Sequence, residues 1–473
     1  MSDKLPLVLD VDGTFLKTDM LLESWWAGMG RDPMATLRAS FGHFRDRAAL
    51  KAELARIAQI RTDLLPVNAD VAAMAATAQD EGREVVLASA SDASLVQPLA
   101  DHYGMGGRIF ASDGHVNLKG VAKADALVAA YGEGGFDYAG NDASDMAVWR
   151  HADTAIVVGG VSGTSKLTNV TKVSGGWAPR DLIRALRPHQ WVKNVLLLLP
   201  MLAAHEFGLA TLGLVLLGIA AFSAAASCIY IVNDLLDLEA DRLHATKCRR
   251  PFASGAVPIT VGMVACGALG VIALGLGALL GGAFLLVVVT YMILSLAYSL
   301  RLKRMRWIDI AVLATLYTLR VVAGAAASRV DASVFMLIFI FPVFITLGCV
   351  KRMTELALAT DDERLPGRGY GRTDRGDLLN MAAIGMVGAL VIFFLYSHSA
   401  QAQVLYPTKW LMWVALVPIT GWLFRMIRLG YLGKQDYDPI VFALRDKRGI
   451  GLLLMTLALM FYSAGIWQQL FGF

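Results

Sequence analysis

Long apolar segments fill the C-terminal part of this 473-residue chain and limit its fold more than any other feature. Each approaches the roughly 20 residues that an α-helix needs to cross the hydrocarbon core of a bilayer. Hydrophobic residues make up 56% of the chain, more than in a typical soluble protein. We therefore expect an all-α integral membrane domain over residues 179–473. Nine segments are predicted to span the membrane: 193–208, 210–232, 258–280, 282–300, 307–327, 332–350, 378–398, 409–429 and 449–470.

Residues 1–160 have a different pattern, in which short apolar runs alternate with charged helical segments. This alternation is typical of a soluble α/β domain with a parallel sheet. We expect its first strands at 5–9, 84–87 and 136–139. A stretch rich in Gly, Ser and Thr at 161–178 is predicted to be a linker to the membrane domain.

The distribution of charge predicts the orientation of the chain. The formal net charge is only +4, but Lys and Arg concentrate in alternate loops between the predicted spans. Such loops face the cytoplasm by the positive-inside rule, and no signal-peptide hydrophobic region precedes Asp10. We therefore expect a multi-pass protein of the inner (plasma) membrane, with its N-terminal domain in the cytoplasm and Phe473 outside. The four cysteines lack the spacing of zinc or disulfide motifs, and no nucleic-acid motif is present.

An acidic motif ends the second predicted span. Asp234, Asp237 and Asp241 follow Asn233 at spacings of three and four, so a helix would place the three carboxylates on one face. Carboxylates are costly at membrane depth, and a helix C-terminus disfavours them further, so a cation must compensate. Oxygen ligands on one face suit Mg²⁺ that carries a substrate phosphate. The alternative is an acidic helix end that is paired with nearby cations, namely Arg242, Lys247, Arg249 and Arg250.

Polar side chains also follow the three strands expected in the N-terminal domain, where open α/β sheets bind their ligands. Asp10 is suited to attack phosphorus and form an aspartyl phosphate. Asp12 can protonate the leaving oxygen and then activate water. Ser89 and Lys123 would hold the phosphate oxygens, with Lys119 as the alternative lysine.

The same cluster offers oxygen ligands for one Mg²⁺. Asp142, together with Asp10 and the backbone carbonyl of Asp12, would bind the ion, and Asp145 would support these ligands.

The order of these motifs resembles the haloacid dehalogenase superfamily, and in particular its phosphoserine-phosphatase-like members. The motifs are DVDGT at 10–14, a strand-end serine, a lysine and GNDASD at 140–145. The resemblance implies a Rossmann-like α/β fold with a small helical cap inserted at about 18–80. Trp25 and Trp26 are expected in the cap core, or else at the bilayer interface. An alternative is a related fold that keeps these residues without turnover. A P-type ATPase fits poorly, because the second acid marks a phosphatase and the domain precedes every span.

A second polar cluster follows the sixth predicted span. Lys351, Arg352 and Glu355 lie at the end of the span, and Arg368 and Tyr370 come later in the same loop. Acids can hold a metal while Lys and Arg bind phosphate oxygens, so this mixture suits a Mg²⁺–diphosphate substrate. Asp361 and Asp362, which lie between these groups, are either metal ligands or ordinary loop residues. Further candidates for substrate contacts are Lys193, Asn194, Asn233, Arg249 and Lys303.

The membrane domain resembles the UbiA superfamily of intramembrane prenyltransferases. The motifs that carry the resemblance are NDLLDLEAD at 233–241, RRPFASG at 249–255 and YSLRLKR at 298–304. Members that prenylate aromatic rings have a second DxxxD motif in the later loop, where this chain has KRMTEL at 351–356. Together with RPHQWVKN at 187–194, this departure resembles the branch of polyprenyl-phosphate phosphoribosyltransferases, such as those acting on decaprenyl phosphate. Those enzymes transfer 5-phosphoribose from phosphoribosyl pyrophosphate to a lipid phosphate.

These resemblances imply a bifunctional enzyme. The membrane domain would make polyprenyl-phosphoryl-5-phosphoribose, with one or two Mg²⁺ and the diphosphate held by the NDLLDLEAD motif. Lys193, Lys351 and Arg352 would bind phosphates, because an exchange of acids for bases suits a substrate with an additional phosphate. The N-terminal domain, with one Mg²⁺, would then remove the 5-phosphate.

Two alternatives come from other functional classes. One is an aromatic or quinone prenyltransferase that uses a prenyl diphosphate, with an N-terminal domain that acts on an unrelated phosphate. The other is a lipid-phosphate carrier without turnover, against which the two sets of metal-binding motifs argue.

Overall fold

The computed structural model describes residues 4–330, 333–359, 368–435 and 438–472, without the side chains of 469–471. Asp361 and Asp362 lie outside the described residues. The chain divides into two compact units, which we describe separately. Unit 1 comprises residues 1–186 and 230–267, and unit 2 comprises residues 187–229 and 268–473.

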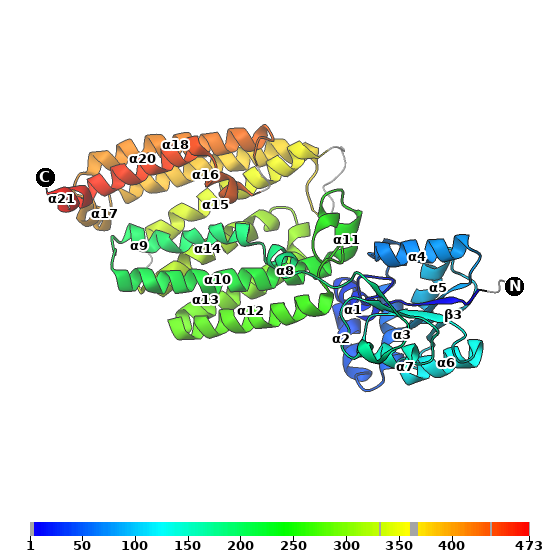
Figure 1. Ribbon diagram of the computed structural model, residues 1–473. Helices are drawn as coiled ribbons and strands as arrows, with labels where there is room; N and C mark the ends of the chain where they lie inside the picture. Colours follow the sequence, from blue (N-terminus) through cyan, green and yellow to red (C-terminus); the bar gives the residue numbers. More distant parts are fainter. Residues whose placement is uncertain (1–3, 331–332, 360–367, 436–437, 473) are drawn as a thin grey trace. The chain divides into compact units, whose positions relative to one another are not determined.

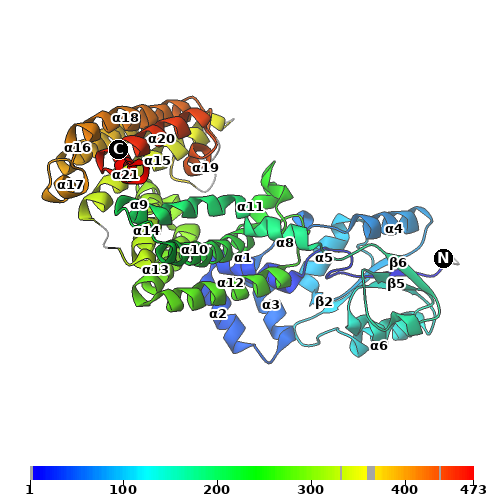
Figure 2. The same ribbon diagram turned by 60° about the vertical axis from the view of Figure 1, so that its left-hand side comes forward.

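A parallel sheet of six strands, in the order β3-β2-β1-β4-β5-β6, forms the centre of unit 1 (Figures 1 and 2). The order reverses between β1 and β4, and this switch point is where such sheets bind ligands. The strands are β1 (Leu7–Asp10), β2 (Val85–Asp92), β3 (Ile109–Ser112), β4 (Asp137–Gly140), β5 (Ala155–Val158) and β6 (Val170–Val173).

The alternating side chains of the strands build a core on each face of the sheet. On one face, Leu7 and Leu9 pack with α4 (Ala69–Asp80) and α5 (Ala93–His102). On the other face, Val8 packs with α6 (Val121–Tyr131) and α7 (Met146–Trp149). Unit 1 therefore contains a three-layer α/β sandwich, which confirms the predicted α/β class.

The register aligns the carboxyl ends of the central strands. Asp10 pairs with Ala88 of β2, and Leu9 pairs with Ala139 of β4. The second strand runs further than predicted, because residues after Leu87 continue to pair with β3 up to Asp92. The residues that follow β1 and β4 and those at the end of β2 therefore meet at one edge.

Three helices are inserted after β1 and form a cap. They are α1 (Met20–Arg31), α2 (Pro33–Gly42) and α3 (Arg47–Ala58), and each begins after an aspartate whose side chain accepts a backbone N–H. Inside the cap, Trp25 and Trp26 pack edge to face with ring centroids 4.8 Å apart, and Trp25 Nε1 donates to Ser40 Oγ.

The cap is shorter than the predicted range of 18–80. The chain returns from it near Val67, which forms an antiparallel bridge with Leu16. The next helix, α4, packs its buried residues against β1 and so belongs to the sandwich. The prediction assigned this helix to the cap because it lies between the first two motifs in the sequence.

The predicted linker at 161–178 is also partly ordered. It contains the short 3₁₀ segment η3 (Thr164–Lys166) and the edge strand β6, which pairs with β5 from Val170 to Val173. The strand was not predicted because its four residues, VTKV, form only a short β-branched run within a stretch rich in Gly, Ser and Thr, and the two central residues are exposed at the sheet edge.

Seven helices of the described chain are long and apolar enough to cross a membrane. They coincide with seven of the nine predicted spans. The total of nine membrane-spanning helices therefore stays a prediction. These helices are α10 (Leu209–Leu236), α12 (Ile259–Leu280), α13 (Gly282–Leu300), α14 (Ile308–Ser328), α15 (Val334–Leu358), α16 (Arg375–Tyr396) and α18 (Lys409–Tyr431).

The first and last predicted spans have a different structure. Residues 193–208 include the end of the 3₁₀ segment η4 (Pro188–Leu198) and the short helix α9 (Leu199–Ala203), so they form no single long α-helix. Near the C-terminus, α20 (Lys447–Ser463) has 17 residues and is followed by α21 (Ile466–Phe471). Gly465 separates the two with a φ of 76°, which ends the regular helix.

Candidate active sites

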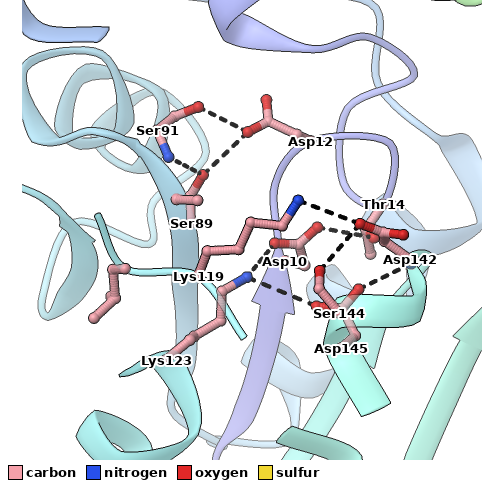
Figure 3. A network of polar contacts seen from close by, with 12 residues as sticks. Asp10, Asp12, Thr14, Ser89, Ser91, Lys119, Lys123, Asp142, Ser144 and Asp145 are labelled. Atoms are coloured by element: carbon pink, nitrogen blue, oxygen red, sulfur yellow. Dashed lines mark hydrogen bonds and ion pairs between the residues drawn. The ribbon is translucent and has the colours of Figure 1, made fainter. Parts of the chain in front are cut away.

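Asp10 at the end of β1 forms a buried ion pair with Lys123 of α6 (Figure 3). Lys123 Nζ lies 2.5 Å from Asp10 Oδ1, although the residues are 113 positions apart in sequence. Thr14 Oγ1 donates to Asp10 Oδ2 at 3.3 Å. The structure thus places Lys123 against the predicted nucleophile, while Lys119 lies 3.5 Å from Asp142 in an exposed pair.

Asp145 organises the turn after β4. Its Oδ1 accepts a hydrogen bond from Tyr138, and its Oδ2 accepts from the backbone N–H groups of Asn141 and Asp142. A Cβ atom at Gly140 would lie 2.6 Å from Asp145 Oδ2, so this close approach requires glycine. Both oxygens of Asp145 are thus engaged by the protein, which fits the predicted supporting role better than direct metal binding.

Asp12 is held by three donors. Its Oδ1 accepts from the backbone N–H of Met20 at 2.8 Å, and its Oδ2 accepts from Ser91 Oγ at 2.7 Å and Ser89 Oγ at 3.3 Å (Figure 3). The predicted phosphate ligand Ser89 is fully buried here and contacts Asp12. Ser91 and Tyr138 were not among the predicted site residues, because strand-end serines and buried tyrosines are common without a catalytic role.

Burial and neighbouring charges change the ionisation of this cluster. Burial raises the pKa of Asp10 to about 7; Lys123 opposes the shift, while the charges of Asp145 and Asp12 add to it. Burial alone would lower the pKa of Lys123, but the negative charges of Asp10 and Asp145 outweigh it and raise that pKa above its usual value. Lys123 is therefore a fixed cation at neutral pH, and Asp10 titrates there.

No three Asp, Glu, His or Cys side chains of the described residues lie close enough to hold a metal ion. In unit 1, the carboxylates of Asp10 and Asp142 follow neighbouring strands and provide oxygen donors of the kind that Mg²⁺ prefers. The donor chemistry of these residues therefore fits Mg²⁺.

The Asp-rich motif of unit 1 bends at its centre. Helix α10 ends at Leu236, Asp237 has non-helical backbone angles, and α11 runs from Leu238 to Leu243. The hydrogen bonds from Asp237 N to Asn233 O and from Asp241 N to Asp237 O preserve the helical register across the bend. The single helix that the spacing predicted is thus interrupted, but Asp234 and Asp241 stay close enough to contact the same arginine.

Arg250 joins the two buried carboxylates of this motif. Its Nη1 lies 3.1 Å from Asp234 Oδ1 and 2.7 Å from Asp241 Oδ2, and both aspartates are 2% exposed. Of the nearby cations that were considered as partners for these aspartates, Arg250 does pair with them. Arg242 instead forms an ion pair with Glu23. Two carboxylates that converge on one positive charge also fit the donor set of Mg²⁺.

In unit 2, two predicted phosphate-binding lysines converge on Asp438. Lys193 Nζ forms an ion pair with Asp438 Oδ2, and Lys351 Nζ lies 3.7 Å from the same oxygen. Burial would raise the pKa of Asp438, but the two lysines outweigh it and hold that pKa below its usual range. Asp438 also accepts backbone N–H bonds at the start of α19 (Pro439–Ala443). Asp438 was not among the predicted site residues, because it lies in a loop whose sequence is dominated by basic residues.

Arg352 lies in a separate buried network. Its Nε and Nη2 bind Asp309 at 2.5 and 2.8 Å, Nη1 binds Glu355, and Nη2 also donates to Tyr298 at 2.8 Å. Arg368 Nη1 donates to the same tyrosine at 2.9 Å. All three guanidinium nitrogens of Arg352 thus bind protein acceptors, so its geometry fits a positioning role instead of the predicted direct contact with phosphate.

The remaining candidates have varied environments. Asn194 is buried, accepts from Arg320 Nε at 3.0 Å and donates to Ser223 at 2.9 Å. Tyr370 is buried and accepts from the backbone N–H of Trp307. Three others lie at partly or fully exposed positions: Asn233, Arg249 and Lys303.

Comparison with known proteins identifies the class of the membrane domain. Residues 195–446 match the model of the UbiA prenyltransferase family, so the chain belongs to this family of integral membrane transferases. It is 34% identical over 471 residues to the uncharacterized protein y4nM of Sinorhizobium fredii, covering 96% of this chain and 90% of that protein.

The membrane domain is also similar to a named enzyme. The chain is 40% identical over 273 residues to decaprenyl-phosphate phosphoribosyltransferase of Mycobacterium tuberculosis, covering 56% of this chain and 88% of that enzyme. The structure of a UbiA homologue from Archaeoglobus fulgidus, bound to GPP and Mg²⁺, aligns with a TM-score of 0.46 at 16% identity. That alignment covers 59% of this chain and 99% of the homologue.

The raised pKa of Asp10 predicts a dependence of stability on pH. An unfolded aspartate has a pKa of about 3.9, against about 7 in the folded domain. The protonated carboxyl group therefore stabilises the fold; this contribution is complete below about pH 4 and is lost as the pH rises through about 7. In EDTA, we expect wild type to lose melting temperature relative to Asp10→Asn between about pH 5 and 8, since Asn does not titrate. A constant difference between the two melting curves would contradict the shift.

The shared contact at Asp438 predicts a graded loss of stability in unit 2. Asp438→Asn removes the charge that balances Lys193 and Lys351 but keeps an acceptor for α19, and we expect a cost of about 3 kcal/mol. Asp438→Ala also removes the cap, for about 1 kcal/mol more. Lys351→Met should cost less than either, because Lys193 keeps its ion pair. Thermal melting in detergent measures the order, and equal melting temperatures for Asp438→Asn and wild type would contradict it.

Proposed function

We propose that this chain is a bifunctional enzyme of lipid-linked sugar synthesis. Its membrane domain transfers 5-phosphoribose from phosphoribosyl pyrophosphate to a polyprenyl phosphate, and its α/β domain removes the 5-phosphate from the product. The observation that carries the first half is the 40% identity to decaprenyl-phosphate phosphoribosyltransferase over 88% of that enzyme. The second half rests on the buried Asp10–Lys123 pair and its neighbours at the switch point of the sheet.

In the transfer step, an oxygen of the lipid phosphate bonds to C1 of the ribose while the bond from C1 to pyrophosphate breaks. The lipid phosphate is already ionised, so the step needs no strong general base. Asn233, Asp234, Asp237 and Asp241 are the proposed ligands of Mg²⁺ and diphosphate. When bound, Mg²⁺ neutralises the leaving pyrophosphate.

The cations of unit 2 suit the other phosphates of these substrates. Lys193 and Lys351 are held close together by Asp438, so a bound phosphate would meet two ammonium groups that are already positioned. Arg352 and Glu355 support this site from the adjacent network around Asp309.

In the phosphatase step, the carboxylate of Asp10 attacks phosphorus and the bond to the ribose 5-oxygen breaks. Asp12 gives its proton to that oxygen and then takes a proton from the water that hydrolyses the aspartyl phosphate. The bonds from Ser91, Ser89 and the Met20 N–H support Asp12 in this role, because they fix its carboxylate beside the nucleophile. Mg²⁺ would be held by Asp10, Asp142 and the Asp12 carbonyl.

The proposed orientation puts both sites on the cytoplasmic side. It is supported by the excess of Lys and Arg in alternate loops, one of which contains Arg249 and Arg250. Phosphoribosyl pyrophosphate is a soluble anion of the cytoplasm, so such an orientation gives it access to the Asp-rich motif.

Two substitutions separate the proposed activities. With Mg²⁺, decaprenyl phosphate and phosphoribosyl pyrophosphate, we expect wild type to give a ribosylated lipid. Asp10→Asn should give a product heavier by one phosphate, because the amide cannot act as a nucleophile. Asp234→Asn should give none, with pyrophosphate release reduced by at least about a hundredfold. Mass spectrometry of the extracted lipids distinguishes these products.

Asp113→Asn serves as the matched control, because Asp113 is a surface aspartate of the same domain. A product of equal phosphate count in wild type and Asp10→Asn would exclude the phosphatase step. Absence of ribosylated lipid in every sample would exclude the transferase assignment, and a prenyl diphosphate with an aromatic acceptor would then be the substrates to test.

A further inference from the structure

A buried ion pair joins the cap to the segment that carries the Asp-rich motif. Arg242 of α11 binds Glu23 of α1 through two parallel contacts, Nη1 to Oε2 at 3.0 Å and Nη2 to Oε1 at 2.5 Å. The two side chains are 8% and 3% exposed. Arg242 Nε also donates to the carbonyl of Ala253, and Thr18 donates to Glu23. Arg242 thus uses all three guanidinium nitrogens, and its geometry is fixed from both sides.

A second contact falls where the cap joins the sandwich. The two connections run side by side, with the Lys17 N–H donating to Pro66 O at 2.8 Å. Gly255, in the turn after Arg250, packs closely against both connections, at Lys17 and Pro66. A Cβ atom at Gly255 would lie 2.6 Å from Lys17 Cβ and 3.0 Å from Pro66 Cγ, and the φ of Gly255 is +69°. Only glycine fits this position without displacing the connections.

Helix α1 therefore contacts both candidate sites. At its start, the Met20 N–H donates to Asp12 Oδ1, the proposed general acid of the phosphatase. One turn later, Glu23 binds Arg242, which belongs to the same short helix as Asp241. Asp241 in turn shares Arg250 with Asp234. The contacts form a continuous chain from the phosphatase acid to the Asp-rich motif, all within unit 1.

We propose that Glu23, Arg242 and Gly255 couple the two reactions. They do so by fixing the cap, and the two connections that join it to the sandwich, to the segment that carries the Asp-rich motif. This inference rests on the proposed function. These are positioning residues, because they touch neither proposed substrate. Their effect is that the phosphorylated lipid passes to the phosphatase site faster than it escapes.

The physical basis is the cost of an unpaired buried charge. Removing one partner of a buried, doubly hydrogen-bonded pair leaves the other charge uncompensated, so the interface opens. An opened interface loosens the cap, but it leaves in place the Asp10–Lys123 pair and the two serine hydroxyls of β2 that also hold Asp12. Breaking the pair should therefore affect the transfer between the steps more than the steps themselves.

The test compares full-length wild type with Glu23→Gln, Glu23→Arg, Arg242→Glu and the double variant Glu23→Arg/Arg242→Glu in lipid nanodiscs. Three quantities are measured: pyrophosphate release with decaprenyl phosphate and phosphoribosyl pyrophosphate, hydrolysis of soluble ribose 5-phosphate, and the fraction of lipid product that still carries the 5-phosphate. The first two report the separate steps, and the third reports their coupling.

We expect each single charge reversal to change the separate steps by no more than about twofold and to raise the phosphorylated lipid fraction about tenfold. The double variant should restore the wild-type fraction, because it places the opposite charges in each other's position. An unchanged fraction in the single variants would overturn the proposal. So would a double variant that resembles the single ones, since that result indicates general damage to the fold.

Hydrogen exchange tests the contact independently of either activity. Arg242→Glu and Gly255→Ala should speed exchange of the amides of α1, and Glu23→Gln should have a smaller effect because it keeps the shape of the side chain. Unchanged exchange in α1 would overturn the interface itself. If wild type released no pyrophosphate from phosphoribosyl pyrophosphate, the proposed function would fail, and the exchange result would still decide whether the cap is fixed to the Asp-rich segment.

Discussion

A carboxylate that leaves water needs a positive charge beside it, and this requirement governs both units of the protein. Asp10 lies against Lys123, Asp234 and Asp241 against Arg250, and Glu23 against Arg242. The same arrangement recurs in unit 2, where Asp309 pairs with Arg352 and Asp438 with two lysines. Each pair offsets part of the cost of burying the carboxylate.

Two consecutive cations, Lys351 and Arg352, meet this requirement in different ways. Lys351 and Arg352 are consecutive on α15, so their side chains point about 100° apart around the helix. Lys351 faces Asp438 and keeps a compact charge near a second lysine, whereas Arg352 is enclosed by acceptors that match its planar fork. Lysine suits exchange with an anionic ligand, and arginine suits a permanent network. The motif KRMTEL therefore combines a proposed binding residue with a positioning residue.

The predictable parts of this structure are those that depend on local pattern. Asp10, Lys123 and Asp145 come together because parallel strands align their carboxyl ends, a rule that the sequence pattern allows one to apply. Asp438 and Asp309 were not predicted, since their importance depends on lysines and arginines that only tertiary structure brings near. The bend at Asp237 and the 3₁₀ geometry of η4 were missed for a related reason: apolar composition reveals a segment's environment but not where its hydrogen-bond pattern changes. Similarly, β6 was missed because a run of four residues, with two exposed at the sheet edge, is too short to stand out from the Gly- and Ser-rich stretch around it.

The pair between Glu23 and Arg242 has a consequence for how the chain is made. The two residues are 219 positions apart, and the apolar helix α10 lies between them. During synthesis the α/β sandwich leaves the ribosome first, with the carboxylate of Glu23 still unmatched. Its partner is delivered only after α10 has been synthesised and offered to the bilayer. The surface of the N-terminal domain is therefore completed only after this long apolar helix has been made.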